Sequence, residues 1–148
     1  MTLPVRSPRP EDASLPDLGE PTWGPPAITT ELRPGSWGRD IAADVLLGET
    51  SVTNVVDGAL VRFERTGRAL ALTGFDRVSV RDDPVSARAL SRRQFELVRD
   101  GATIRVAAEL GLSCTASDLL LTVAMTATEG DELVWSRDWD ATIPRDHL

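Results

Sequence analysis

The closing segment of the chain places an arginine between two tryptophans at alternate positions. Trp135, Arg137 and Trp139 are spaced i, i+2 and i+4, so in a β-strand their side chains lie on one face. A guanidinium held between two indoles can stack on the rings and attract an anion, while the rings form apolar walls. Two interpretations follow: a half-buried structural arginine paired with a carboxylate or carbonyl, which we favour, or a ligand site. The ligand site would consist of Trp37, Trp135, Arg137 and Trp139.

The serine, histidine and cysteine residues that could take part in nucleophilic catalysis lack the required sequence context. Ser36 follows Gly35 directly, whereas a nucleophile elbow needs the spacing G-x-S-x-G between a strand and a helix. We interpret Ser36 as a turn residue that enters a strand. A serine triad also needs an imidazole, and the single histidine, His147, stands next to the end of the chain, where side chains are usually exposed. Cys114 has no neighbouring base or cation in the sequence that would favour a thiolate, so we expect a buried or half-buried structural thiol. No catalytic residue is assigned from the sequence.

Two pairs of aspartates could in principle perform acid–base chemistry. Asp82 and Asp83 precede Pro84, a context typical of turns in which aspartate side chains bond to the backbone. Asp138 and Asp140 share the strand face opposite to the tryptophan stripe. General acid–base catalysis needs at least one carboxyl whose pKa is raised by burial. We therefore expect a structural turn for the first pair and solvated charges for the second.

Composition narrows the classes of partner. The 148 residues include 16 basic and 23 acidic side chains, for a net charge of −7, and this acidic balance argues against a nucleic-acid binder. No apolar run is long enough to span a bilayer. One cysteine and one histidine exclude a disulfide framework and the usual zinc sites. We expect a cytoplasmic protein without metal, cofactor, nucleic acid or membrane as partner.

Prolines divide the chain near residue 35. Proline fixes φ and removes a backbone donor, so residues 1–34 are expected to form an extended arm docked on a surface. This arm holds eight of the ten prolines: Pro4, Pro8, Pro10, Pro16, Pro21, Pro25, Pro26 and Pro34.

Residues 35–148 have the pattern of a single antiparallel β domain. Turn signals such as Asp57-Gly58, Asp100-Gly101 and Glu129-Gly130 recur at short intervals. Between them, apolar and polar residues alternate, as in residues 104–110 and 119–126. These runs predict strands of roughly ten residues, and hence an all-β meander of long strands that curls into a barrel or sandwich.

Residues 85–99 are ambiguous between helix and strand. Asp83 and Pro84 resemble a helix N-cap followed by proline at the first helical position, and Gly101 could end the helix. The apolar residues of the segment make no clean 3.6-residue stripe, and its neighbours are strand-like. We favour a strand.

Several segments resemble a known family. Residues 3–6 (LPVR) and 9–16 (RPEDASLP) are similar to the stretch that leaves the last strand of the C-terminal jelly roll in hydrolases of the CocE/NonD type, which belong with the X-Pro dipeptidyl-peptidase (S15-like) α/β-hydrolases. Further segments look like the extreme C-terminal β region of some bacterial members: Trp37 with Arg39-Asp40, residues 82–87, residues 112–115 and residues 129–146. The similarity covers nearly the whole chain and is strongest in the proline arm and the closing strand.

This resemblance implies an accessory role. Family members carry their catalytic serine, aspartate and histidine in an upstream α/β-hydrolase domain, and no position of this chain corresponds to them. The resemblance thus implies a β domain that packs on a catalytic and jelly-roll body, and it favours a strand for residues 85–99.

Two functions of different class remain open. In the first, the chain is a non-catalytic interaction module that docks its arm and one sheet face on an α/β-hydrolase, or associates with itself. In the second, it is a stand-alone small β-barrel that binds, or transforms, an apolar small molecule in a tryptophan-lined cavity.

Overall fold

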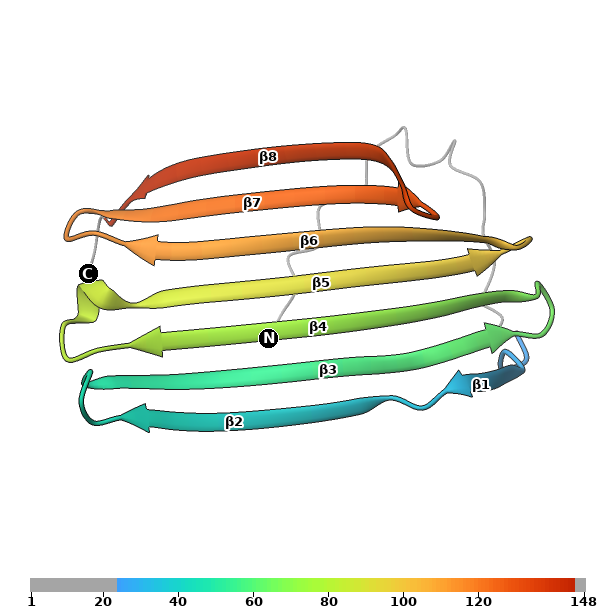
Figure 1. The fold of residues 1–148 in the computed structure, drawn as a ribbon, viewed down its shortest axis with the longest axis horizontal. Coiled ribbons are helices and arrows are strands. Elements are labelled where there is room, and N and C mark those ends of the chain that lie inside the picture. The colour runs from blue at the N-terminus through green and yellow to red at the C-terminus, as the bar shows by residue number, and fades with distance from the viewer. Residues whose placement is uncertain (1–23, 146–148) are drawn as a thin grey trace, which may run out of the picture.

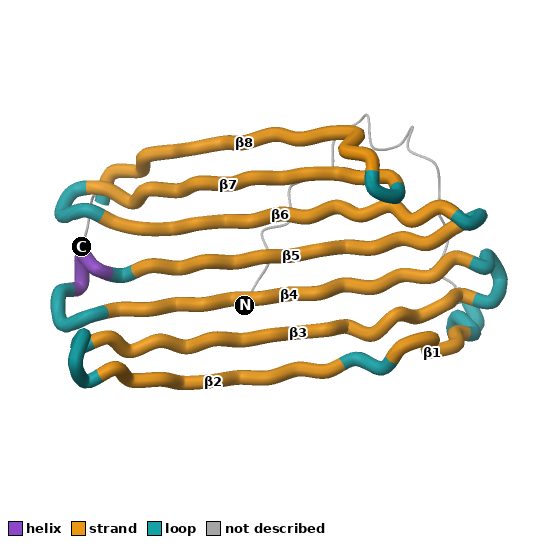
Figure 2. Tube along the Cα trace, in the orientation of Figure 1, coloured by secondary structure: helices purple, strands orange, loops and turns teal. Residues whose placement is uncertain are grey.

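A computed structural model describes residues 24–145, which form one antiparallel sheet of eight strands (Figures 1 and 2). The sheet is a meander from β2 to β8, in which each strand pairs with the next, and β1 pairs with the end of β3 that β2 leaves free. The predicted all-β class and the antiparallel meander of long strands are confirmed. The strands are β1 (Thr29–Arg33), β2 (Ser36–Asp44), β3 (Glu49–Phe63), β4 (Arg68–Val80), β5 (Arg88–Arg99), β6 (Ala102–Cys114), β7 (Asp118–Glu129) and β8 (Glu132–Pro144).

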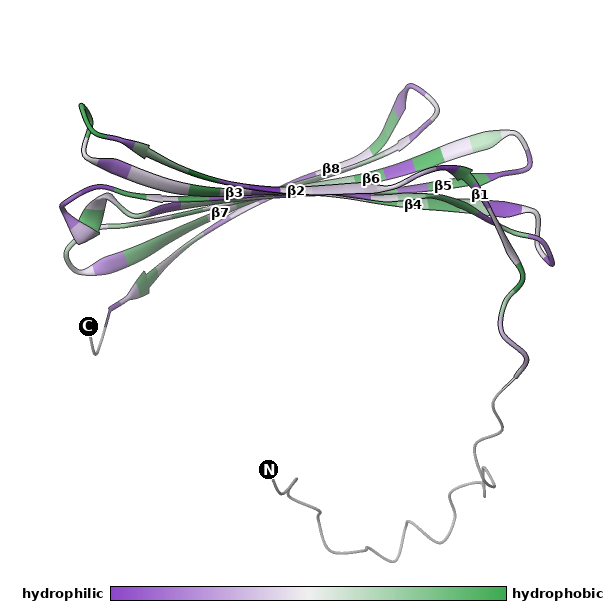
Figure 3. Cartoon of the chain, turned by 90° about the horizontal axis from the view of Figure 1, so that it is seen from below, coloured by the Kyte–Doolittle hydropathy of each residue, from purple (hydrophilic) through white to green (hydrophobic). Residues whose placement is uncertain are grey.

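The sheet is a single open layer within residues 24–145. Seen from below, its strands cross at the centre and fan apart at both ends (Figure 3), which is the shape that the right-handed twist of long strands produces. β2 and β8 form opposite edges and do not pair with each other. The described strands therefore do not close into a barrel.

Tight turns account for the meander. Asp100 and Gly101, which link β5 to β6, both have positive φ, at 51° and 79°. This is the backbone of a type I′ hairpin, and Asp-Gly is a favoured sequence for it. Gly130, between β7 and β8, also has a positive φ of 59°. These turns reverse the chain within two residues and keep successive strands adjacent.

Residues 84–99 form one short turn of helix and then a β-strand. The Asp83 side chain accepts a hydrogen bond of 2.9 Å from the backbone N–H of Val85 and so caps a 3-10 turn, η2 (Pro84–Ser86). The chain then enters β5, which pairs along its length with β4 and β6. The N-cap signal was thus genuine, but the helix ends after three residues. Within residues 24–145 this turn is the one helical segment, and no helix there is long and apolar enough to cross a membrane.

The junction between β1 and β2 is fixed by an irregularity in β3. The pairing register shifts between Asp57 and Leu60, and Ala59 has a positive φ of 66°. A Cβ on Gly35 would lie 2.5 Å from the carbonyl oxygen of Asp57 and 2.9 Å from the nitrogen of Ala59. Only glycine fits so close to this backbone. Residues 29–33, which the proline pattern places in the arm, form β1 against β3.

Candidate functional site

The two faces of the sheet differ in chemistry. Paired residues of antiparallel strands point to the same face, so the register assigns every strand position to one side. One side, here called the apolar face, collects large apolar side chains from seven strands. Its members include Trp37, Ile41, Val52, Val56, Leu70, Leu72, Val78, Val80, Phe95, Leu97, Ile104, Val106, Leu110, Leu112, Leu119, Leu121, Val123, Met125, Trp135, Trp139 and Ile143.

This apolar face is uncovered by residues 24–145. Leu72 and Phe95, cross-strand neighbours at the centre of the sheet, are 50% and 40% exposed. The buried residues in this part of the chain are small, namely Ser51, Ala59, Ala69 and Ala71, and no large side chain is fully buried. A sheet of this kind normally packs one face against another layer. Residues 24–145 therefore form one layer of a hydrophobic core and do not supply the second layer.

The opposite side, the polar face, has the features of a solvent-facing surface. Ion pairs join neighbouring strands: Arg92 with Glu109 at 2.6 Å and Arg105 with Glu96 at 2.8 Å. Three shallow hollows indent this face where small side chains such as Ala107 and Ala124 lie between longer ones. These ion pairs neutralise part of the charge of the polar face across strands.

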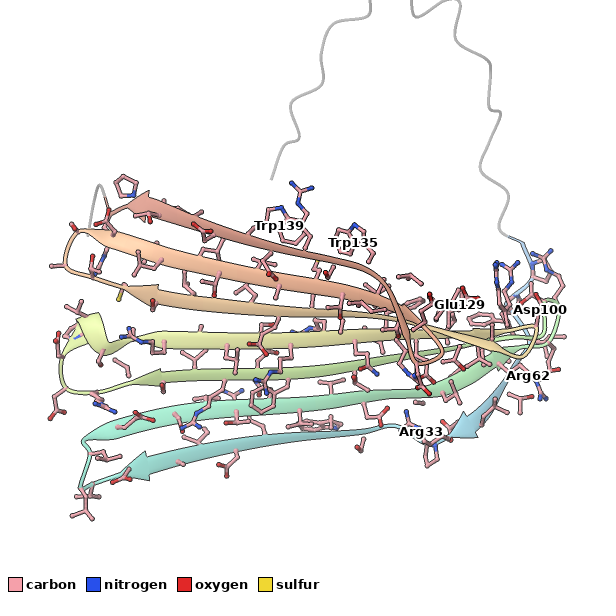
Figure 4. All side chains as sticks on the ribbon, turned by 45° about the horizontal axis from the view of Figure 1, so that its top comes forward. Arg33, Arg62, Asp100, Glu129, Trp135 and Trp139 are labelled. Atoms are coloured by element: carbon pink, nitrogen blue, oxygen red, sulfur yellow. The ribbon has the colours of Figure 1, made fainter. Side chains whose placement is uncertain are left out.

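The tryptophan stripe of β8 lies on the apolar face, as predicted. Trp135 and Trp139 project to the same side of the strand, with ring centroids 6.2 Å apart and planes inclined by 48° (Figure 4). The guanidinium carbon of Arg137 lies 5.0 Å from the ring centroid of Trp139, which is a cation–π contact. The indoles are 44% and 37% exposed. The geometry supplies an aromatic and cationic surface at one edge of the sheet.

The expected partner of Arg137 is not found among residues 24–145: no carboxylate there lies within 4.0 Å of its guanidinium, and no hydrogen bond to a carbonyl occurs. The prediction of a paired arginine is therefore wrong for the described residues. The physical reason is the edge position of β8, because Arg137 reaches water and does not need a protein partner.

The four residues of the predicted ligand site do not come together. Trp37 stands on β2, at the opposite edge of the sheet from β8, and is 81% exposed. Trp139 lines one of the three hollows, whereas Trp37, Trp135 and Arg137 line none of them. A single tryptophan-lined cavity is thus absent from the described part of the chain.

Other candidate residues occupy structural positions. Ser36 begins β2 opposite Asp57. Cys114 is half-buried, and its thiol lies 3.5 Å from the carbonyl oxygen of Val85. Asp138 and Asp140 are exposed on the polar face, as expected for solvated charges. His147 lies outside the described residues. Within residues 24–145, no three side chains of His, Cys, Asp or Glu lie close enough together to hold a metal ion.

Two ion pairs that the sequence analysis did not identify link neighbouring strands. Arg33 donates to Asp57 and so holds the pKa of that carboxyl below its ordinary value. On the apolar face, Arg93 and then Ser91 donate to Asp76 and lower its pKa in the same way. Both pairs join neighbouring strands, since Arg33 is on β1 and Asp57 on β3, and Arg93 is on β5 and Asp76 on β4. These ion pairs hold neighbouring strands together, and we assign them no catalytic role.

No protein-family model, curated protein or solved structure matches this chain.

Proposed function

We propose that this chain is a non-catalytic accessory module whose apolar face packs on the body of an α/β-hydrolase. The observation that carries the proposal is the apolar face, which residues 24–145 leave uncovered and which extends across seven strands from Trp37 on β2 to Trp139 on β8. Exposed apolar patches of this extent on a folded protein mark interaction surfaces.

The dimensions of the face suit a stable protein interface. Strands of 12 or 13 residues such as β5 and β6 are about 40 Å long. The six strand spacings from β2 to β8 add a width of roughly 29 Å. The face thus offers on the order of 1,000 Å², comparable to the roughly 800 Å² that each partner buries in a standard interface. A small molecule would cover only a fraction of it.

The choice of a hydrolase body as partner rests on the resemblance of residues 3–16 and 129–146 to the C-terminal region of CocE/NonD-type hydrolases. Ser36 lines a hollow of the polar face, but residues 24–145 contain no histidine that could supply an imidazole beside it, which agrees with an accessory role. We place the module in the cytoplasm, since an acidic chain with one cysteine requires no oxidising compartment.

Site-specific photo-cross-linking tests this function. Phe95 and Gln94 are adjacent on β5 but point to the apolar and the polar face respectively. A benzophenone amino acid is placed at position 95 in the full chain, inside the cells that produce it, with position 94 as the matched control. We expect an α/β-hydrolase, identified by mass spectrometry, to be cross-linked from position 95 and not from position 94. Equal cross-linking from both positions, or cross-links confined to this chain, would contradict the proposal.

A further inference from the structure

A row of short polar side chains crosses the polar face from β2 to β7. The register places its members opposite one another on successive strands, so the row runs across the sheet and not along a strand. Five of the six members carry a hydroxyl, a carboxylate or an amide. This polar row consists of Ser36, Asp57, Thr73, Gln94, Ala107 and Thr126.

The polar row is the floor of the largest of the three hollows on this face. All six members line that hollow, whose volume is about 780 Å³. Five strand spacings separate Ser36 on β2 from Thr126 on β7, so the hollow is roughly 24 Å long. The longer side chains of Phe75, Arg92 and Glu109 occupy the neighbouring row and also line the hollow. The result is an open trough, long enough to hold a linear ligand.

The floor of the trough has unused hydrogen-bonding groups. The side chains of Thr73, Gln94 and Thr126 are half-buried, yet none of them makes a hydrogen bond within residues 24–145. A hydroxyl both donates and accepts, and an amide offers two donors and one acceptor oxygen. Polar groups in this position need water or a ligand as partner. The polar row therefore offers donors and acceptors in a line.

The charged residues that line the trough are all paired. Arg92 and Glu109 form one ion pair across β5 and β6, at 2.6 Å. Two further ion pairs include a lining residue each, namely Arg33–Asp57 and Arg93–Asp76. Asp138 on β8, the next position beyond Ala124 in the row of Glu109, has no ion pair within residues 24–145. This charge pattern favours a neutral ligand over an anion, because no lining cation is free to receive one.

Phe75 gives the trough an apolar wall beside its charged groups. Phe75 is half-buried and lies opposite Arg92 in the register, and the guanidinium carbon of Arg92 lies 5.8 Å from the ring centroid. The π-electrons make the face of an aromatic ring slightly negative, so it attracts the slightly positive C–H bonds of a sugar ring. The hydroxyls of the sugar need the donors and acceptors that the polar row supplies. The trough thus matches both kinds of surface on a pyranose.

We propose that the polar row binds a neutral oligosaccharide, which lies across the strands with its hydroxyls on Thr73, Gln94 and Thr126. A peptide fits the trough less well, because extended peptides bind a sheet by pairing along an edge strand, whereas the trough runs across the strands. A nucleic acid would need unpaired cations for its phosphates. The docking surface proposed above is the opposite face of the sheet, so this inference does not rest on the proposed function.

The probes are five neutral hexasaccharides: maltohexaose, cellohexaose, xylohexaose, mannohexaose and chitohexaose. Binding of each to the full chain is measured by isothermal titration calorimetry. We expect at least one of them to bind. The disaccharide of the same sugar should bind at least about tenfold more weakly, because it reaches only part of a trough of this length.

Matched variants locate the binding site. Thr73→Val/Thr126→Val removes two hydroxyls of the floor while the shape is kept, and should weaken binding of the hexasaccharide by about tenfold, as the loss of two neutral hydrogen bonds predicts. Thr53→Val/Thr122→Val makes the same change on the polar face outside this hollow, and should keep the affinity of the parent. Circular dichroism of both variants checks that the β fold is retained.

Three results would overturn the inference. The first is failure of all five hexasaccharides to bind the parent at millimolar concentration. The second is equal affinity of the parent and Thr73→Val/Thr126→Val, which would place the sugar elsewhere. The third is a neutral peptide of serine, threonine and glutamine that binds as tightly as the best hexasaccharide, which would assign the trough to a peptide. Cross-linking from position 95 tests the other face, so each proposal can fail without the other.

Discussion

The guanidinium carbon of Arg137 lies 5.0 Å from the ring centroid of Trp139, and both side chains stand on the uncovered apolar face at the last strand of the sheet. The contact is an edge feature open to solvent. It orients the cation without burying it.

Replacement of Arg137 by alanine should therefore cost little. An exposed cation–π contact contributes about 0.5 to 1 kcal/mol. Removal of the Arg137 side chain breaks no ion pair within residues 24–145. Urea denaturation monitored by circular dichroism measures the change. A loss beyond roughly 2 kcal/mol would show that Arg137 has a buried ionic partner.

Gly35 and Gly38 form a matched pair for the junction of β1 and β2. Gly35→Ala places a methyl group 2.5 Å from a backbone oxygen of β3, and overpacking of this kind costs about 1 to 3 kcal/mol. Gly38→Ala meets no atom within 4 Å, so it should be neutral or slightly stabilising through the unfolded chain. Thermal unfolding of the two variants measures the difference in stability. Equal unfolding midpoints would contradict the close approach of Gly35 to the backbone of β3.

Strand periodicity predicted the faces of β6 and β7 because their alternate residues differ in polarity. Residues 85–99 were harder, since Asp83 and Pro84 truly begin a helical turn and only pairing with β4 and β6 shows that the turn stops. The isolation of Trp37 from Trp135 could not be predicted, because it depends on the order of strands in the finished sheet. The same order leaves Arg137 at an edge without the expected partner.

Asp57 should make stability depend on pH. Its pKa is lower in the folded chain than in the unfolded chain because Arg33 donates to it. Its contribution is therefore present above the unfolded pKa and is lost as the pH falls through the folded pKa. Asp57→Asn should be less stable than the parent at pH 7 and equal to it in strong acid. Arg33→Gln and the double variant Arg33→Gln/Asp57→Asn complete a double-mutant cycle. If the two single changes in the free energy of unfolding add up to that of the double variant, Arg33 and Asp57 are not coupled.

Ser36 should be dispensable for any chemistry. Because residues 24–145 contain no histidine to take the hydroxyl proton, the purified full chain should hydrolyse neither p-nitrophenyl esters nor acyl-proline substrates. Ser36→Ala should give the same background rate as the parent. Saturable turnover that this variant lacks would establish Ser36 as a nucleophile.

The openness of the apolar face is tested most directly by the urea midpoint of Leu72→Glu in the full chain, compared with Ala71→Glu. These neighbours on β4 point to opposite faces; Leu72 is 50% exposed, whereas Ala71 is 7% exposed between its neighbours on the polar face. A carboxylate at position 72 should reach water and leave the midpoint near that of the parent, while one at position 71 should lower it because burying a charge is costly. If Leu72→Glu unfolds the chain as readily as Ala71→Glu, the apolar face is already covered by the chain itself and is not a free docking surface.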